Sequence, residues 1–116
     1  MNTIDDKTPE ADRQLYEQAV ANRPDDNLLR ACFAQYLEAM GNRTEAISEC
    51  ERVCELLPDL EWPRYYLGDL LARAGRYSEA AESFKRSLQI RSDFTQAKKA
   101  LQQIQFNHPA AVGMRK

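Results

Sequence analysis

The residues of this chain best suited to chemistry are three cysteines and a single histidine. Cys50 and Cys54 lie four residues apart, a spacing that places both thiols on one face of a helix and can hold a metal ion. A tetrahedral zinc site needs two more ligands, and His108 lies near the end of the sequence. We therefore expect both cysteines, and by default Cys32, to be buried as small apolar residues, with no metal site and no cofactor.

Nucleophilic catalysis has no obvious general base, because the one histidine is expected outside the core. The carboxylates are numerous but scattered over what would be helix surfaces, and no glycine-rich phosphate loop is present. The sequence therefore predicts a protein that is not an enzyme.

The composition favours helices. The chain has 116 residues, of which 43% are hydrophobic, with only 4 glycines and 5 prolines. This length fits one domain with a modest core, and the expected class is all-α. No apolar run approaches the roughly 20 residues that cross a bilayer. The polar N-terminus does not resemble a signal peptide, and the odd cysteine count fits a reducing compartment, so we expect a cytoplasmic protein without membrane insertion.

The charges are unevenly distributed along the chain. Residues 1–60 hold 13 acidic and 6 basic residues (−7), whereas residues 61–116 hold 5 acidic and 10 basic residues (+5). This asymmetry can steer an acidic partner, can bring two copies together head to tail, or can be a solvated surface that segregates by chance. Nucleic acid is not a predicted partner, because the overall balance is acidic and no basic stripe with interleaved aromatic residues occurs.

The sequence repeats itself with a period of 34 residues. Aligning residues 27–60 with residues 61–94 needs no gap and gives seven identities. The identical pairs are Arg30 and Arg64, Leu37 and Leu71, Gly41 and Gly75, Glu45 and Glu79, Ala46 and Ala80, Arg52 and Arg86, and Asp59 and Asp93. A repeat of this length is typical of paired helices that stack on their neighbours.

Within each repeat, apolar residues recur at helical spacing on both sides of a glycine. Gly75 can adopt the left-handed conformation that ends a helix cheaply. Gly68 and Ala80 are small where two helices must approach closely, and Phe84 fills the space between repeats. The pattern predicts two antiparallel helices joined by a tight turn in each unit.

On these residues the chain resembles the tetratricopeptide repeat family. The matching positions are Leu67-Gly68, Leu71, Gly75, Tyr77, Ala80, Phe84 and Leu88. Arg30 and Arg64 stand where the family often has Trp, and Ser92 replaces the closing proline that Pro58 keeps. The resemblance implies a short αα superhelix, or solenoid, of antiparallel helix pairs.

The ends of the chain fit a truncated array. We expect a repeat domain over residues 8–107, with a half repeat at 9–26, full repeats at 27–60 and 61–94, and a capping helix at 94–107. Loose tails are expected at 1–7 and 108–116. The six expected helices span about 9–22, 26–40, 43–56, 61–74, 77–90 and 94–107.

The resemblance also implies a binding groove, because the first helix of each pair lines the concave side. The implied groove residues are Leu28, Ala31, Gln35, Glu38, Trp62, Tyr65, Asp69, Arg73, Lys99 and Gln103. Trp62 and Tyr65 are the best candidates for binding anchors. In the alternative interpretation, Trp62 packs over the repeat junction and Tyr65 is merely half exposed.

The predicted function is an adaptor or assembly factor that binds a protein or peptide segment in this groove. Two alternatives remain open: a secretion-type chaperone for an apolar client segment, and a structural unit that self-assembles through the exposed ends of the array. A receptor for chaperone tails is disfavoured, because the Lys, Asn and Arg residues of such a clamp are mostly absent here.

Overall fold

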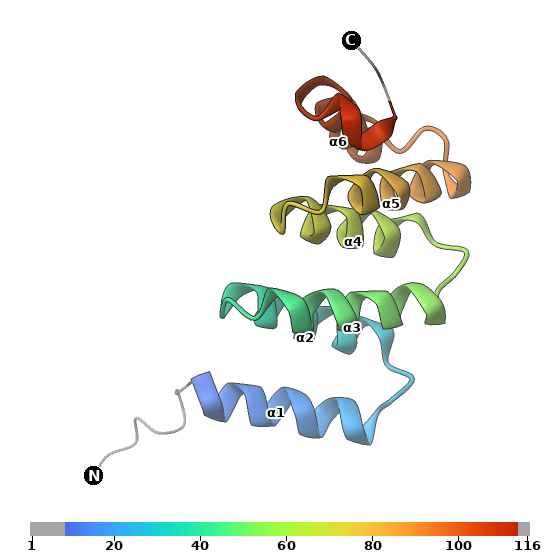
Figure 1. The fold of residues 1–116 in the computed structure, drawn as a ribbon. Helices are drawn as coiled ribbons and strands as arrows, with labels where there is room; N and C mark the ends of the chain where they lie inside the picture. Colours follow the sequence, from blue (N-terminus) through green and yellow to red (C-terminus); the bar gives the residue numbers. More distant parts are fainter. Residues whose placement is uncertain (1–8, 114–116) are drawn as a thin grey trace.

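The computed structural model describes residues 9–113, which form a layered stack of helices (Figure 1). The elements are α1 (Pro9–Asn22), α2 (Asn27–Ala39), α3 (Arg43–Leu56), α4 (Glu61–Arg73), α5 (Tyr77–Ile90), α6 (Thr95–Asn107) and the short 3-10 helix η2 (Pro109–Val112). This confirms the predicted all-α solenoid of six α-helices. Each α-helix begins and ends within one residue of its predicted range.

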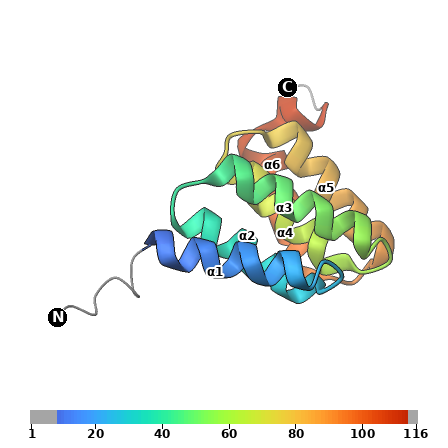
Figure 2. The same ribbon diagram turned by 90° about the horizontal axis from the view of Figure 1, so that it is seen from below.

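In each of the two full pairs, one glycine ends the first helix. Gly41 and Gly75 have φ values of 84° and 78°, in the left-handed region that a residue without Cβ adopts without strain. The chain then reverses sharply, because the backbone N–H of Arg76 donates to the carbonyl of Leu71 over 2.9 Å. In the preceding repeat, the backbone N–H of Asn42 donates to the carbonyl of Leu37 over 2.8 Å. The repeated turn chemistry thus gives two helical hairpins, α2–α3 and α4–α5, that pack against each other through α3 and α4 (Figure 2).

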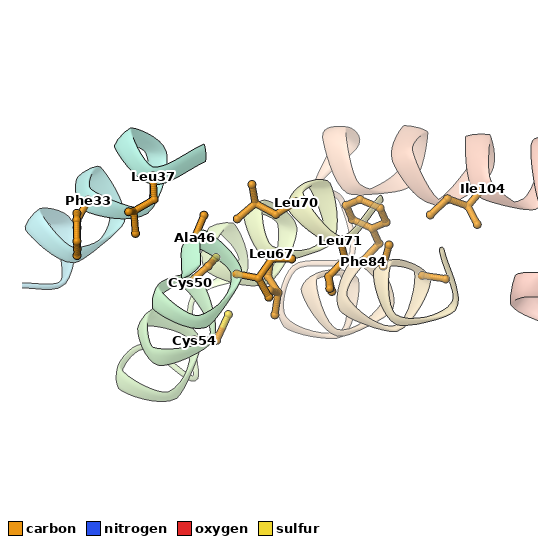
Figure 3. Close-up of a cluster of buried hydrophobic side chains, with 13 residues drawn as sticks. Phe33, Leu37, Ala46, Cys50, Cys54, Leu67, Leu70, Leu71, Phe84 and Ile104 are labelled. Carbon is orange, nitrogen blue, oxygen red and sulfur yellow. The ribbon is translucent and has the colours of Figure 1, made fainter. Parts of the chain in front are cut away.

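One continuous apolar core runs through both hairpins to α6. Its labelled members in Figure 3 are Phe33, Leu37, Ala46, Cys50, Cys54, Leu67, Leu70, Leu71, Phe84 and Ile104. A Cβ atom added at Gly68 would lie only 2.6 Å from the ring of Phe84. Only glycine therefore lets α4 and α5 approach this closely, which explains the small residue predicted at this contact.

The cysteine predictions are confirmed at two positions and wrong at the third. Cys50 and Cys54 are buried, at 1% and 3% exposure. Cys32 is exposed. Its equivalent one period later, Tyr66, is half-buried beside the preceding repeat, and burial together with the nearby Cys50 and Glu38 raises the pKa of Tyr66 to about 12. Cys32 is exposed because α1 is equivalent to the second helix of a pair. Within residues 9–113, no first helix lies before α1 to cover this side of α2.

The chain does not become a loose tail at His108. The imidazole of His108 stacks on the ring of Tyr77 with 3.6 Å between centroids, and η2 then places Ala111 and Val112 against the core. The prediction of a loose tail is therefore wrong for residues 108–113. The apolar residues after Pro109 give the segment a surface to bury. The predicted tail at 1–7, the first residue of the predicted repeat domain (Thr8) and residues 114–116 lie outside the described residues.

Between Pro9 and Gly113, every helix is too short or too polar to cross a lipid bilayer.

Candidate protein-binding groove

The first helices α2, α4 and α6 carry the predicted groove residues, and these differ widely in exposure. Exposed positions are Leu28, Gln35, Arg73, Lys99 and Gln103, and half-buried positions are Glu38, Trp62, Tyr65 and Asp69. Leu28 is 70% exposed, which is high for a leucine. Ala31 is only 8% exposed and contributes to the core. Ala31 is therefore poorly placed to contact a ligand.

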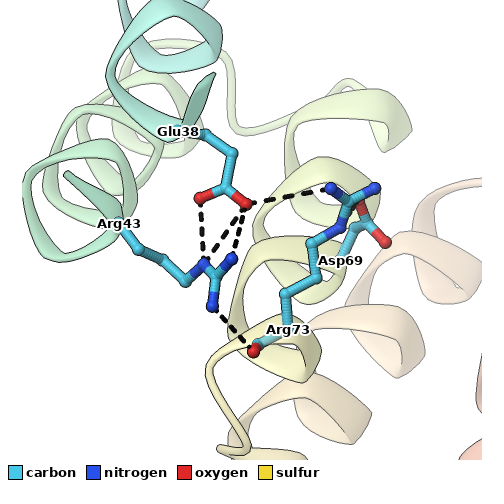
Figure 4. Close-up of polar contacts among 4 residues, drawn as sticks. All are labelled: Glu38, Arg43, Asp69 and Arg73. Carbon is cyan, nitrogen blue, oxygen red and sulfur yellow. Dashed lines mark hydrogen bonds and ion pairs between the residues drawn. The ribbon is translucent and has the colours of Figure 1, made fainter. Parts of the chain in front are cut away.

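Three of the groove residues meet in one polar network that joins both repeats (Figure 4). Arg73 lies 3.2 Å from the carboxylate of Asp69 and 3.8 Å from that of Glu38. Glu38 also accepts hydrogen bonds from the guanidinium of Arg43, from Nε and from a terminal nitrogen, both at 3.0 Å. Exposed ion pairs are individually worth about 0–1 kcal/mol. Their effect here is to hold the side chains of α2 and α4 in one arrangement.

Arg43 is a member of this network that the sequence reasoning missed. Its guanidinium donates to the backbone carbonyl of Arg73 over 2.9 Å, so that it also satisfies a free carbonyl at the end of α4. The hydrogen bond to Glu38 raises the pKa of Arg43, which keeps the guanidinium charged. Arg43 begins a second helix, and the spacing rule used for the groove considers only first helices. Its position directly after the Gly41 turn is the signal that could have identified it.

The two aromatic residues predicted as anchors are both half-buried. The ring of Tyr65 packs against Phe84 at 5.8 Å and edge-on against Phe94 at 5.4 Å, measured between centroids. Tyr65 therefore connects α4 to α5 and to the start of α6, and its removal would disturb the core. This geometry matches the alternative interpretation of Tyr65 better than that of a free anchor.

A small pocket of about 150 Å³ continues the groove towards the C-terminal end. It is lined by Asp69, Ala72, Tyr77, Phe84, Ala100, Gln103, Ile104, Asn107 and His108. Asp69 and Gln103, predicted from spacing, thus share one pocket, and Asp69 links it to the polar network. His108 was missed because the sequence placed it in a tail.

The two cysteines of the pair are both buried, and the hydrogen bond between their thiols lowers the pKa of Cys54. The thiol of Cys50 donates to the carbonyl of Pro63 over 3.6 Å. Contact with the Cys54 thiol and burial raise the pKa of Cys50 far above that of a free cysteine, so the thiol stays protonated. No group of three or more His, Cys, Asp or Glu residues within 9–113 could hold a metal ion.

Comparison with known proteins agrees with the helical repeat. The profile of the tetratricopeptide repeat family matches residues 64–94. DnaJ homolog subfamily C member 3 of Rattus norvegicus is 32% identical over 89 residues, which cover 77% of this chain and 18% of the rat protein. The present chain thus spans about a fifth of the length of that relative.

Among solved structures, a crystal structure of MamA superposes with a TM-score of 0.78 at 16% identity, covering 90% of this chain and 63% of MamA. A second MamA structure, MSR-1, gives a TM-score of 0.69 at 23% identity, again over 90% of this chain and 62% of the other. At this level of identity the likeness concerns the fold. With the 34-residue period, the two glycine-terminated hairpins and the profile match in view, residues 64–94 are a tetratricopeptide repeat.

Proposed function

We propose that this chain is a non-catalytic adaptor or assembly factor that binds a segment of a partner protein in the concave groove formed by α2, α4 and α6. The family and the fold support a protein-interaction or scaffold module. The observation that carries the finer proposal is the network of Glu38, Asp69 and Arg73. These side chains come from successive repeats, and the side chain of Arg73 remains 57% exposed beside an open pocket.

The groove offers two kinds of contact to a ligand. Leu28 and Trp62 occupy equivalent positions one period apart, and both present apolar surface. Arg73, Lys99 and Gln103 supply hydrogen-bond donors further along. This combination suits an extended or helical segment that carries apolar side chains and a carboxylate. The proposed compartment is the cytoplasm, because Cys32, Cys50 and Cys54 are all free thiols.

Affinity capture with mass spectrometry tests this proposal. The groove variant combines Leu28→Ala, Arg73→Ala and Gln103→Ala, all at exposed positions, so the fold should persist. Tyr65 is left intact because of its contacts in the core. The matched control combines Glu82→Ala, Arg86→Ala and Gln89→Ala, which are exposed on α5, a second helix of its pair.

The expected result is a partner that the unchanged chain and the α5 control capture and that the groove variant loses by at least about tenfold, because several contacts are removed together. Equal capture by all three proteins, with unchanged circular dichroism, would show that the groove does not bind the partner.

A further inference from the structure

A larger hollow lies at the opposite end of the molecule from the small pocket. It has a volume of about 470 Å³ and lies between α1 and α2. The lining residues are Asp12, Leu15, Tyr16 and Ala19 on α1, and Leu29 and Tyr36 on α2. We refer to these six residues as the α1–α2 groove.

Nearly every residue of the α1–α2 groove is more exposed than its equivalents in later repeats. Tyr16 is half-buried, whereas the residues at the same position one and two periods later, Cys50 and Phe84, are 1% and 2% exposed. Ala19 is half-buried, whereas its equivalents Val53 and Ser87 are at most 1% exposed. The same surface is therefore closed inside the array and open at its start.

The α2 side of the groove follows the same rule. Tyr36 is half-buried, whereas its equivalents Leu70 and Ile104 are 1% and 4% exposed. Leu29 is half-buried, whereas its equivalent Pro63 is buried. Leu15, on α1, is 63% exposed. Later in the chain the corresponding surface is covered by α4, which packs against both α5 and α6.

We propose that the α1–α2 groove is a docking site for a single amphipathic helix of a partner protein, of about the 13 residues of α4. The apolar face of this helix would resemble that of α4, with a small residue between two large aliphatic ones. One turn after the small residue it would carry a basic side chain. This site is separate from the concave groove and does not depend on the function proposed for it.

The requirement for a basic side chain follows from Asp12. Its equivalents Ala46 and Ala80 are fully buried against the first helix of their own pair. No residue within 9–113 forms an ion pair with Asp12, so a helix covering this carboxylate must supply a cation. Burial and the nearby carboxylate of Asp12 raise the pKa of Tyr36, and the guanidinium of Arg13 acts in the opposite direction.

The position of the cation follows from antiparallel packing. Gly68 on α4 lies against Phe84, and the helix pair is antiparallel. One turn later on α4, Leu71 therefore lies beside Ala80, one turn earlier on α5. In the proposed complex a Lys or Arg takes the place of Leu71, opposite Asp12.

A second copy of this chain is the less suitable occupant. The last of the first helices is α6, and it is the one that a second copy could offer at its end. Gln102 and Gln105 of α6 stand where α4 has Gly68 and Leu71. The 3-10 helix η2 also packs against both α5 and α6 at that end. We therefore assign the site to a helix of another protein, whose apolar face carries no glutamine at these two positions.

A peptide titration tests the proposal on the full chain. The probes are two fluorescein-labelled peptides with the sequence of residues 61–73, one unchanged and one with Leu71→Lys. Fluorescence anisotropy should show that the lysine peptide binds about fivefold to tenfold more tightly, as expected for a charge-assisted contact. In the Asp12→Ala protein, which restores the alanine of the other repeats, this preference should disappear or reverse.

The control variants locate the binding. Leu15→Glu should weaken both peptides by at least about tenfold, through the loss of an apolar contact and the added like charge. Phe106→Glu, at the 87% exposed position of α6, should change nothing. The triple groove variant defined above should bind both peptides as the unchanged chain does.

Several results would overturn the proposal. These are no binding of either peptide at millimolar concentration, equal loss in the Leu15→Glu and Phe106→Glu proteins, or loss of binding in the concave-groove variant, which would place the peptide there. Sedimentation showing self-association that Leu15→Glu abolishes would identify a second copy as the occupant instead of a partner protein.

Discussion

The two ends of the array meet solvent in different ways. At the C-terminal end, α6 replaces apolar positions with Gln102 and Gln105, and η2 folds back so that His108 stacks on Tyr77. At the N-terminal end, α1 and α2 leave Leu15 and Leu28 at 63% and 70% exposure and a hollow of about 470 Å³. Phe106 on α6 is also 87% exposed, so within residues 9–113 the two ends differ in degree: the C-terminal end has the two glutamines and a covering segment, and the N-terminal end has no covering segment.

This difference shows what closing a helical repeat requires. A stacked unit buries its apolar face only against a neighbour, so the last unit needs polar substitutions or an extra covering segment. The C-terminal end uses both devices. Between Pro9 and Asn22 the only such substitution at a small contact position is Asp12, which leaves the neighbouring aromatic and aliphatic side chains available to a partner.

The largest effect is expected from truncating the same repeat position in the two regions. Phe84→Ala should lower the free energy of unfolding by about 3–5 kcal/mol, because Phe84 is 2% exposed and its loss leaves a cavity under Gly68. Tyr16→Ala, two periods earlier, should cost only about 1–2 kcal/mol, since part of its surface already faces water. Urea denaturation monitored by circular dichroism measures both, and similar losses would mean that the N-terminal end is not open.

A covalent cap should remove the difference between the ends. Pro9 is equivalent to Tyr77, two periods later, so residues 61–76 fused directly before Pro9 in place of residues 1–8 place a copy of α4 in register with the α1–α2 groove. This fusion should raise the free energy of unfolding by about 1–3 kcal/mol through apolar burial. The matched control carries serine in place of the fused copies of Leu67 and Leu70. Equal stability of fusion and control would contradict the role assigned to the α1–α2 groove.

Opening the C-terminal end should have a smaller effect. His108→Ala removes the ring that stacks on Tyr77 at 3.6 Å and should lower the free energy of unfolding by about 0.5–1.5 kcal/mol. His108→Phe keeps the stacking and should retain most of the stability. Differential scanning calorimetry can compare the two variants. An alanine variant as stable as the parent would show that the stacking of His108 on Tyr77 does not stabilise the fold.

The attachment of α1 should depend on pH more than that of α6. Arg13 on α1 hydrogen-bonds to Glu45 on α3 over 3.2 Å, and this hydrogen bond lowers the pKa of Glu45. A lowered folded-state pKa gives stability that is present above the unfolded value and lost as the pH falls through the folded value. Hydrogen exchange of the α1 amides, after correction for the intrinsic rate, should therefore rise in acid. Glu45→Gln should remove this response, and its persistence in that variant would assign it to another group.

The smallest effect is expected in thiol reactivity. Thiol labelling compares the N-terminal end of the array with its interior and needs no substitution. Cys32 lies on the uncovered side of α2 and should react with a thiol reagent within minutes. Cys50 and Cys54 should react only in denaturant, since both are buried. Mass spectrometry after timed alkylation counts the modified sites, and rapid labelling of Cys54 would contradict the closed interior.

The fold was predictable because its signals are local and repeated. The apolar stripe, Gly41 and Gly75 and the 34-residue offset each act within one unit, and the six helices follow from them. The groove was predictable only as a list of positions. Spacing gives the face of a helix, but it does not say that Ala31 is buried, that Tyr65 packs on Phe84, or that Arg43 reaches across from another helix. Those outcomes depend on tertiary contacts between helices, as does the folding of residues 108–113.

The bond from Arg43 to the carbonyl of Arg73 has a consequence for the ligand groove that we propose. Arg43 holds the backbone at position 73, not the side chain. Position 73 can therefore exchange its charge or size while the angle between the two hairpins stays fixed. Selectivity and shape are separable at this junction, so new binding preferences can arise there by single substitutions that leave the scaffold intact.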